Sequence, residues 1–133
     1  MEVLLMTVKQ ISVFVENKTG NFSDVVSLLG ENAIDIRALS LADTSDFGIA
    51  RMLVSDTDKA VEILKEQGYA VKCTDVSELL MDHVPGGLSK ILKELKKQEV
   101  GIEYLYAFAD KEDGTAKVVM RTSEPDKVEE LFK

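Results

Sequence analysis

The sequence is poor in the residues that build most metal and catalytic centres. Among its 133 residues it has one cysteine, Cys73, and one histidine, His83. A lone cysteine excludes an intramolecular disulfide and any paired-cysteine metal or redox motif. A lone histidine leaves no His-rich metal site and makes most histidine-dependent triads implausible. We therefore expect no metal and no cofactor, and we interpret Cys73 as a small apolar residue buried in a strand.

Long apolar runs and an excess of positive charge are absent as well. No apolar stretch approaches the roughly 20 residues of a bilayer-spanning helix, and the first six residues lack the basic start and cleavage site of a secretory leader. Sixteen basic residues against 24 acidic ones give a net charge of −8. Because such a field repels nucleic-acid phosphates and anionic lipids, we expect neither nucleic acid nor a membrane as a partner. The composition is typical of an acidic cytoplasmic protein.

What the sequence does contain is an internal repeat. A shift of 66 places aligns three pairs of segments: 16–22 with 82–88, 34–36 with 100–102, and 48–51 with 114–117. Acidic, glycine and apolar positions recur together in these pairs, and we place a two-residue insertion in the second copy just before its last helix. Such a repeat predicts two small copies of one fold.

Both copies show the same alternation of strand and helix patterns. Ile11, Val13 and Val15 alternate with polar residues, which is typical of a half-buried strand. The apolar residues at 22, 25, 26 and 29 share one face of a helix, which we expect to have Asn21 as its N-cap. The patterns predict further strands over 34–42, 48–55, 71–76, 79–82, 102–109 and 116–121, and further helices over 57–67, 88–97 and 123–133.

This order, βαββαβ, is that of the ferredoxin-like fold, in which two helices cover one face of an antiparallel sheet. We predict an α+β protein of two such domains packed side by side, 1–76 and 77–133, joined without a linker through one bent continuous strand. The second copy lacks its last strand, since nothing follows its second helix. Either residues 2–6 or a partner chain fills the gap, or a sheet edge stands open.

Most activities that this fold supports lack their residues here. Metal-transfer domains need paired cysteines, RNA-binding domains need aromatic residues on the central strands, and phosphate loops end in Gly-Lys-Ser/Thr. The sequence has none of these. Tyr104, Tyr106 and Phe108 alternate along one strand, which we interpret as a sheet face covered by helices or by the other domain. We predict that the protein is not an enzyme; a small enzyme using His83 is the least favoured alternative.

The glycine loop between the first strand and the first helix of each copy is the candidate site. Gly20 and Gly86 remove side chains where a helix begins, so backbone N–H groups and the helix dipole can receive a small anion such as a carboxylate. Glu16, Asp82 and Asn17 lie beside these donors and can accept from an ammonium group. Together they suit the zwitterion of an α-amino acid. The alternative is that the glycines only turn the chain at a helix start.

These loops resemble the signature of the ACT domain family, small βαββαβ regulatory modules that bind amino acids. In that signature a strand ends in an acid and x-x-Pro-Gly-x-Leu follows at the helix start; residues 82–88 have all of it. Residues 16–22 keep the acid and the glycine but have Thr19 in place of proline and Phe22 in place of leucine. The starts of the second strands are similar too. The resemblance covers residues 8–133 as two tandem copies.

The resemblance implies that a free amino acid binds at the interface between the two domains, held by the loop of one and the second strand of the other. Loop backbone would hold the carboxylate, and Asn17, Asp82 or a strand carbonyl the ammonium group. The resemblance nominates these ligand-binding residues: Asn17, Lys18, Thr19, Gly20, Asn21, Phe22, Ile34, Asp35, Ile36, His83, Val84, Pro85, Gly86, Gly87, Leu88, Val100, Gly101 and Ile102.

Two functional hypotheses follow. The leading one is a non-catalytic, amino-acid-binding regulatory protein of amino acid metabolism. The alternative is a regulatory subunit that acts only through protein–protein contacts with a metabolic enzyme. In either case we expect a homodimer, because an unpaired strand edge can pair with a second copy of the chain.

Overall fold

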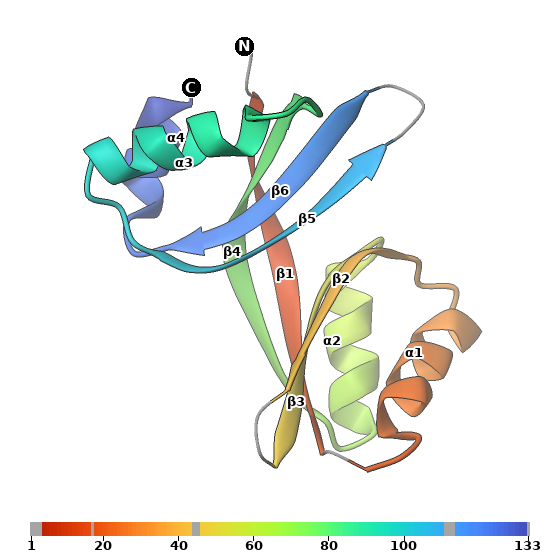
Figure 1. The fold of residues 1–133 in the computed structure, drawn as a ribbon. Helices are drawn as coiled ribbons and strands as arrows, with labels where there is room; N and C mark the ends of the chain where they lie inside the picture. Colours follow the sequence, from red (N-terminus) through yellow and green to blue (C-terminus); the bar gives the residue numbers. More distant parts are fainter. Residues whose placement is uncertain (1–3, 17, 44–45, 111–113, 133) are drawn as a thin grey trace. The chain divides into compact units, whose positions relative to one another are not determined.

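The structure is a computed structural model, and it describes residues 4–16, 18–43, 46–110 and 114–132. For residues 43, 109 and 110 it describes the backbone alone. The chain divides into two compact units. The first unit is Lys9–Asp75, and the second unit is Val76–Lys133 together with Met1–Val8. Figure 1 shows that each unit combines strands with helices.

The first unit has its strands in the order β2-β3-β1-β4. β1 and β2 both pair antiparallel with β3, so Ile11 and Leu39 lie on either side of Met52. Val25 of α1 and Leu64 of α2 join the strand residues in one core, so both helices cover the same face of this sheet. The elements are β1 (Leu4–Glu16), α1 (Asn21–Glu31), β2 (Ile36–Asp43), β3 (Phe47–Val54), α2 (Thr57–Glu66) and β4 (Ala70–Asp82).

The second unit repeats this plan with the strand order β5-β6-β4-β1. β4 and β5 both pair antiparallel with β6, so Leu79 and Ala107 lie on either side of Val118. Its core also holds Ile91 of α3 and Val128 of α4. The additional elements are α3 (Gly87–Lys97), β5 (Ile102–Asp110), β6 (Thr115–Thr122) and α4 (Pro125–Leu131). The two predicted ferredoxin-like domains are therefore present.

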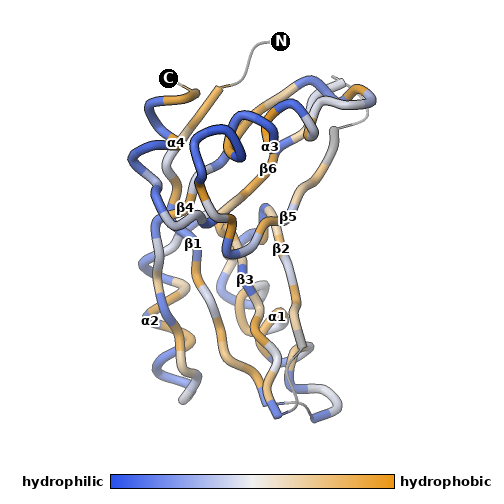
Figure 2. The backbone as a smooth tube through the Cα atoms, turned by 60° about the vertical axis from the view of Figure 1, so that its left-hand side comes forward, coloured by the Kyte–Doolittle hydropathy of each residue, from blue (hydrophilic) through white to orange (hydrophobic). Residues whose placement is uncertain are grey.

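Hydrophobic and hydrophilic residues alternate along the helices, as Figure 2 shows. This is the pattern of a helix that packs one face against a sheet and exposes the other. None of the helices in the described ranges is long and apolar enough to cross a membrane.

β1 and β4 each contribute to both units. Both strands are 13 residues long, and in both the first half is largely exposed and the second half largely buried. The boundary between the units falls after Val8 in β1 and after Asp75 in β4. The prediction that one continuous strand joins the two copies is confirmed, because β4 runs without interruption from the first copy into the second.

The start of β1 takes the position of the last strand in the second unit. β1 follows β4 in the strand order, and Leu5 packs against the core of this unit. Of the alternatives for the gap, filling by the N-terminal segment is thus confirmed for residues 4–6. The predicted domain 1–76 differs from the structure here, since the chain up to Val8 belongs with the second unit. The reason is physical: β4 needs a neighbour on its free side, and in the described chain no strand follows α4.

Each unit contains the same kind of hydrogen bond between the start of its second strand and a serine that follows its third strand. The backbone N–H of Gly101 donates to Ser123 Oγ at 3.1 Å, as the N–H of Asp35 does to Ser55 Oγ at 2.9 Å. Because its hydroxyl bonds to the start of β5, Ser123 does not begin the last helix. α4 starts at Pro125 and is shorter than the predicted 123–133.

The insertion in the second copy also lies elsewhere than predicted. Val15 pairs with Gly48 in the first unit, and the corresponding Met81 pairs with Ala116 in the second. Gly48 therefore corresponds to Ala116 and not to Gly114. The two extra residues belong to the hairpin between β5 and β6, because a hairpin loop accepts added residues without disturbing the strand register.

Candidate functional site

The two glycine loops have the same backbone. Gly20 and Gly86 are the N-cap residues of α1 and α3, with φ angles of 91° and 85° in the left-handed region that favours glycine. No side chain of a described residue caps either helix. Within the described chain, no hydrogen bond engages the backbone N–H groups of Phe22 and Ser23 in the first turn of α1. These donors are therefore unoccupied within the described chain, and anion binding at this loop remains a prediction.

Asn21 has a different role from the predicted one. Its side-chain amide donates to the backbone oxygen of Glu16 at 3.1 Å, so it links the end of β1 to the start of α1. The prediction that Asn21 is the N-cap is wrong, because Gly20 takes that position. Asn17, a predicted ligand residue, lies outside the described residues.

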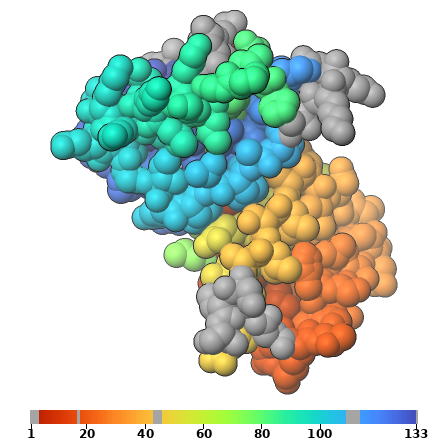
Figure 3. All heavy atoms as spheres, in the orientation of Figure 1, coloured from red at the N-terminus to blue at the C-terminus, as the bar shows by residue number. Residues whose placement is uncertain are grey.

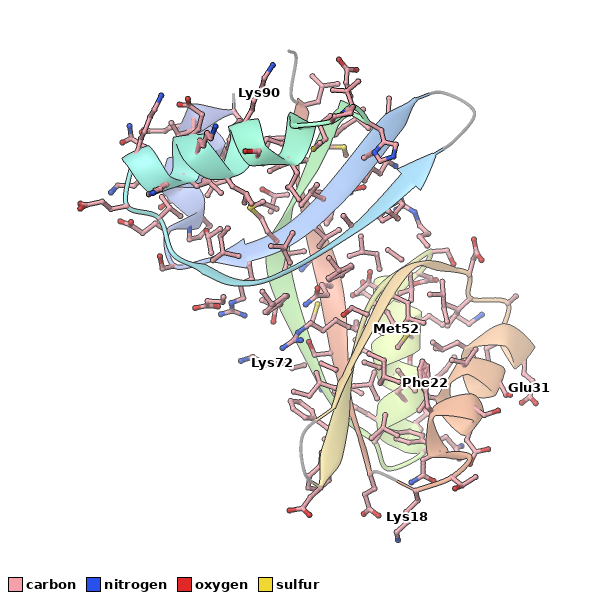
Figure 4. The ribbon with its side chains drawn as sticks, in the orientation of Figure 1. Lys18, Phe22, Glu31, Met52, Lys72 and Lys90 are labelled. Carbon is pink, nitrogen blue, oxygen red and sulfur yellow. The ribbon has the colours of Figure 1, made fainter. Side chains whose placement is uncertain are left out.

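A pocket of about 280 Å³ opens beside the first loop. Its residues come from three places in the first unit: the end of β1 with the loop after it, the first turn of α1, and the β2–β3 pair. Figure 4 shows Phe22 inside this unit and Lys18 at its outer end. The lining residues are Val15, Glu16, Lys18, Phe22, Leu41, Ala42 and Gly48.

The pocket combines apolar side chains, of which Leu41 is 55% exposed, with a charged rim. The rim is an ion pair in which Lys18 Nζ lies 3.1 Å from Glu16 Oε2. Both side chains are largely exposed, so the pair contributes little to stability and is readily rearranged. Gly48 contributes no side chain, so backbone forms this part of the wall.

Of the predicted residues in the first loop, Lys18 and Phe22 line the pocket, and Thr19, Gly20 and Asn21 lie next to it along the chain. Val15, Leu41, Ala42 and Gly48 were not predicted. The only sequence signal for them is Gly48, a glycine inside an otherwise apolar strand pattern, which often marks a close approach of backbone or ligand.

The predicted residues at the start of the second strands lie elsewhere. Ile34 and Val100 are buried in the two cores, against which Ile36 and Ile102 also pack. The N–H groups of Asp35 and Gly101 are bonded to serine hydroxyls, as described above. In the first unit Ile36 pairs with Val54, whereas Glu16, next to the loop, pairs with Phe47 at the other end of β3. Within one unit the structure therefore does not bring these residues to the loop.

The second loop is exposed, and only the residues at the start of α3 are packed inside the unit. His83, Val84, Pro85 and Gly86 are exposed, and the loop leading into α3 lies on the surface in Figure 3. The His83 N–H donates to the Gly114 carbonyl at 2.8 Å. The last two predicted residues are packed inside the second unit. Gly87 is buried, and Leu88 packs against the core.

One further expectation differs from the structure, and of another the structure excludes one of its two alternatives. Cys73 is exposed in β4 and not buried, because it lies in the exposed first half of that strand. The stripe of Tyr104, Tyr106 and Phe108 is not covered by the helices of its own unit. Tyr106 pairs with Val119, and the neighbouring Val118 faces the helix-side core, so the stripe lies on the opposite face of the sheet.

Comparison with known protein families identifies the family of this chain. A family model described as an ACT domain pair matches residues 6–132. The chain belongs to the ACT domain family. The matched region takes in both units, so the repeat seen in the sequence is a pair of ACT domains.

Several solved structures have a similar fold. Protein BT0572 from Bacteroides thetaiotaomicron is 43% identical, with a TM-score of 0.89 over 96% of this chain and 87% of that one. The ligand-free regulatory subunit of aspartate kinase from Thermus thermophilus is 16% identical, with a TM-score of 0.71 over 96% and 93% of the two chains. The corresponding subunit from Thermus flavus is 17% identical, with a TM-score of 0.67 over 100% and 98%. No protein of curated function matches the sequence significantly.

Proposed function

We propose that this ACT domain pair is a non-catalytic regulatory protein that binds a free amino acid at the glycine loop of the first unit. The observation that carries this proposal is the pocket beside that loop, which combines apolar side chains with a rim of both charges. An α-amino acid matches these features. Its carboxylate and ammonium groups can pair with the charged rim, and its side chain can pack against the apolar residues.

The expected contacts use two free backbone N–H groups and the exposed ion pair at the rim. The carboxylate accepts from the free N–H groups of Phe22 and Ser23 and from Lys18. The ammonium group donates to Glu16. The side chain lies against Phe22 and Leu41. The sequence-based expectation that the ligand lies between the two domains remains a prediction.

A regulatory subunit that acts only through contacts with a metabolic enzyme remains the second candidate. The two Thermus proteins with the same fold are named as regulatory subunits of aspartate kinase, which supports a partner enzyme for this chain as well. The open sheet edge expected in the second copy supports a partner less strongly, because the start of β1 occupies that strand position. A homodimer, too, remains a prediction.

A thermal-shift panel of the twenty amino acids against the full chain tests the leading function. Binding at about 100 times the dissociation constant adds about 2.7 kcal/mol to the free energy of unfolding, which raises the melting temperature of a protein this small by several degrees. We expect a rise for a subset of the amino acids. A panel in which none of the twenty raises the melting temperature of a folded sample would contradict amino-acid binding and favour the second candidate.

A further inference from the structure

One edge of the sheet in the first unit is formed by β2. In the part of the chain that the structure describes, β2 has a strand neighbour on one side only, which is β3. Every second residue of an edge strand directs its backbone N–H and C=O groups away from the sheet, where they can pair with another strand. Proline, lysine and bulges are the usual protection of such edges. β2 contains neither proline nor lysine, and its register shifts only between Ile36 and Ala38.

Two leucines give this edge an exposed apolar surface. Leu39 pairs with Met52 and Leu41 pairs with Ala50, and both partners belong to the core of the first unit. Because directly paired residues share a face of the sheet, both leucines lie on the face that carries the helices. They nevertheless remain 44% and 55% exposed. A further strand beside β2 would bury them.

The residues of β2 are arranged symmetrically about Ser40. Residues 37–43 read Arg-Ala-Leu-Ser-Leu-Ala-Asp, so the two sides of Ser40 match except at the ends, which have opposite charges. In an antiparallel pair of two such strands centred on Ser40, each leucine lies opposite the other leucine, and Arg37 lies opposite Asp43. A two-fold axis through Ser40 forms each of these contacts twice. β2 is therefore complementary to itself in its apolar and in its charged residues.

The corresponding edge strand of the second unit lacks this complementarity. In the described chain β5 pairs with β6 alone, and it has Leu105 opposite Met120 where β2 has Leu39 opposite Met52. The charged residues of β5, at positions 103 and 110, are both acidic. Glu103 is moreover paired with Arg121 of β6 at 2.8 Å. Two copies of β5 would offer each other acidic residues without a basic partner, which disfavours their pairing.

We propose that β2 is the surface at which this chain pairs with a second copy of itself, strand against strand, in an antiparallel register centred on Ser40. The pairing joins two first units into one continuous sheet and gives a two-fold symmetric homodimer. The opposite charges at the ends of β2 favour the same strand as the partner, because an antiparallel copy presents Asp43 to Arg37 and Arg37 to Asp43. This inference does not depend on the proposed function. It also concerns another edge than the one left open by the sequence, which the start of β1 closes.

Analytical ultracentrifugation of the full chain, from low to high micromolar concentrations, tests the surface. We expect a particle of two chains. Leu39→Asp puts two carboxylates into the centre of the interface and should raise the dissociation constant of the dimer about tenfold or more. Leu105→Asp, at the equivalent position of β5, is the matched control and should leave the dimer unchanged. Circular dichroism verifies that both variants are folded.

Two charge variants test the register. Arg37→Asp makes both ends of β2 acidic and Asp43→Arg makes both ends basic, so each variant alone should weaken the dimer about tenfold at low salt. An equimolar mixture of the two should restore a dimer with one chain of each kind, since every acidic end then meets a basic one. Mixing would not repair a general loss of stability.

Each other outcome overturns part of the proposal. A monomer at all concentrations, or a parent dimer that Leu39→Asp leaves intact, would show that β2 is not the pairing edge. Equal weakening by Leu105→Asp would contradict the difference between the two edges. If the mixture of charge variants remained monomeric, the register centred on Ser40 would be wrong. Particles of more than two chains would contradict the two-fold arrangement.

Discussion

At the scale of single residues, glycines in the two loops serve different physical needs. Gly20 and Gly86 provide a left-handed backbone where a helix begins. Gly87 does not have a positive φ; it is needed because Met81 and the Asp82 carbonyl approach it closely. The first unit has Asn21 at the place of Gly87, and its amide bonds to the Glu16 carbonyl. The shared sequence motif therefore hides a difference in packing that only the structure reveals.

Replacing Gly87 by alanine should destabilise the protein by about 1–3 kcal/mol. The added Cβ would overlap a methionine methyl group, which can move, and a backbone oxygen, which cannot move without shifting β4. Gly30→Ala in α1 is the control: nothing lies within 4 Å of its added Cβ, so alanine should stabilise by about 0.4–1 kcal/mol. Urea unfolding of the two variants measures both. Equal stabilities of Gly87→Ala and the parent would contradict the close packing.

At the scale of elements, apolar periodicity predicted almost every helix and strand to within two residues. It placed α2 at 57–67, against the observed Thr57–Glu66. The failures have local causes. The first part of β1 was missed because residues 4–9 show no regular alternation of polar and apolar residues. α4 was started too early because Ser123 looks like an N-cap, whereas its hydroxyl accepts from Gly101.

The two last helices of the ACT domains differ in how they begin, and this difference is testable. Asp56 caps α2 by accepting from the backbone N–H of Lys59 at 3.1 Å, whereas α4 has no side-chain cap at Glu124. Asp56→Ala should therefore cost about 1 kcal/mol. Glu124→Ala removes only an exposed ion pair with Lys127 and should cost no more than about 0.5 kcal/mol. Chemical denaturation compares the two, and a larger loss from Glu124→Ala would contradict this assignment of the caps.

At the scale of the whole molecule, the sequence predicted the duplication but assigned its ends incorrectly. A repeat is found by comparing residues along the chain. Such a comparison groups the N-terminal residues with the first copy, because that copy follows them directly in the sequence. Which strand they pair with depends on the three-dimensional fold. β1 begins beside β4 in the second unit and continues into the first, so its two halves serve different domains. The candidate site shows the same limit: the loop was found, but Leu41 and Gly48 come to it only through the pairing of β1, β2 and β3.

This use of β1 predicts that a substitution near the N-terminus weakens the distant C-terminal part of the chain. Leu5 packs against the core formed by Leu79, Ile91 and Val128, although about seventy residues or more separate it from them in sequence. Leu5→Ala should destabilise the second unit by about 1–2 kcal/mol, less than for a fully buried leucine because Leu5 is only partly buried. Leu4→Ala is the control, since Leu4 is 54% exposed and its loss should change little.

Hydrogen exchange resolved by residue distinguishes a local from a general effect of Leu5→Ala. We expect the amides of α3, β6 and α4 to exchange faster, because opening of the second unit no longer disrupts the Leu5 contacts and therefore costs less free energy. The amides of α1 and α2, whose core is formed by other residues, should keep the protection of the parent protein. If protection fell equally in both units, or only in α1 and α2, the start of β1 would not be the last strand of the second ACT domain.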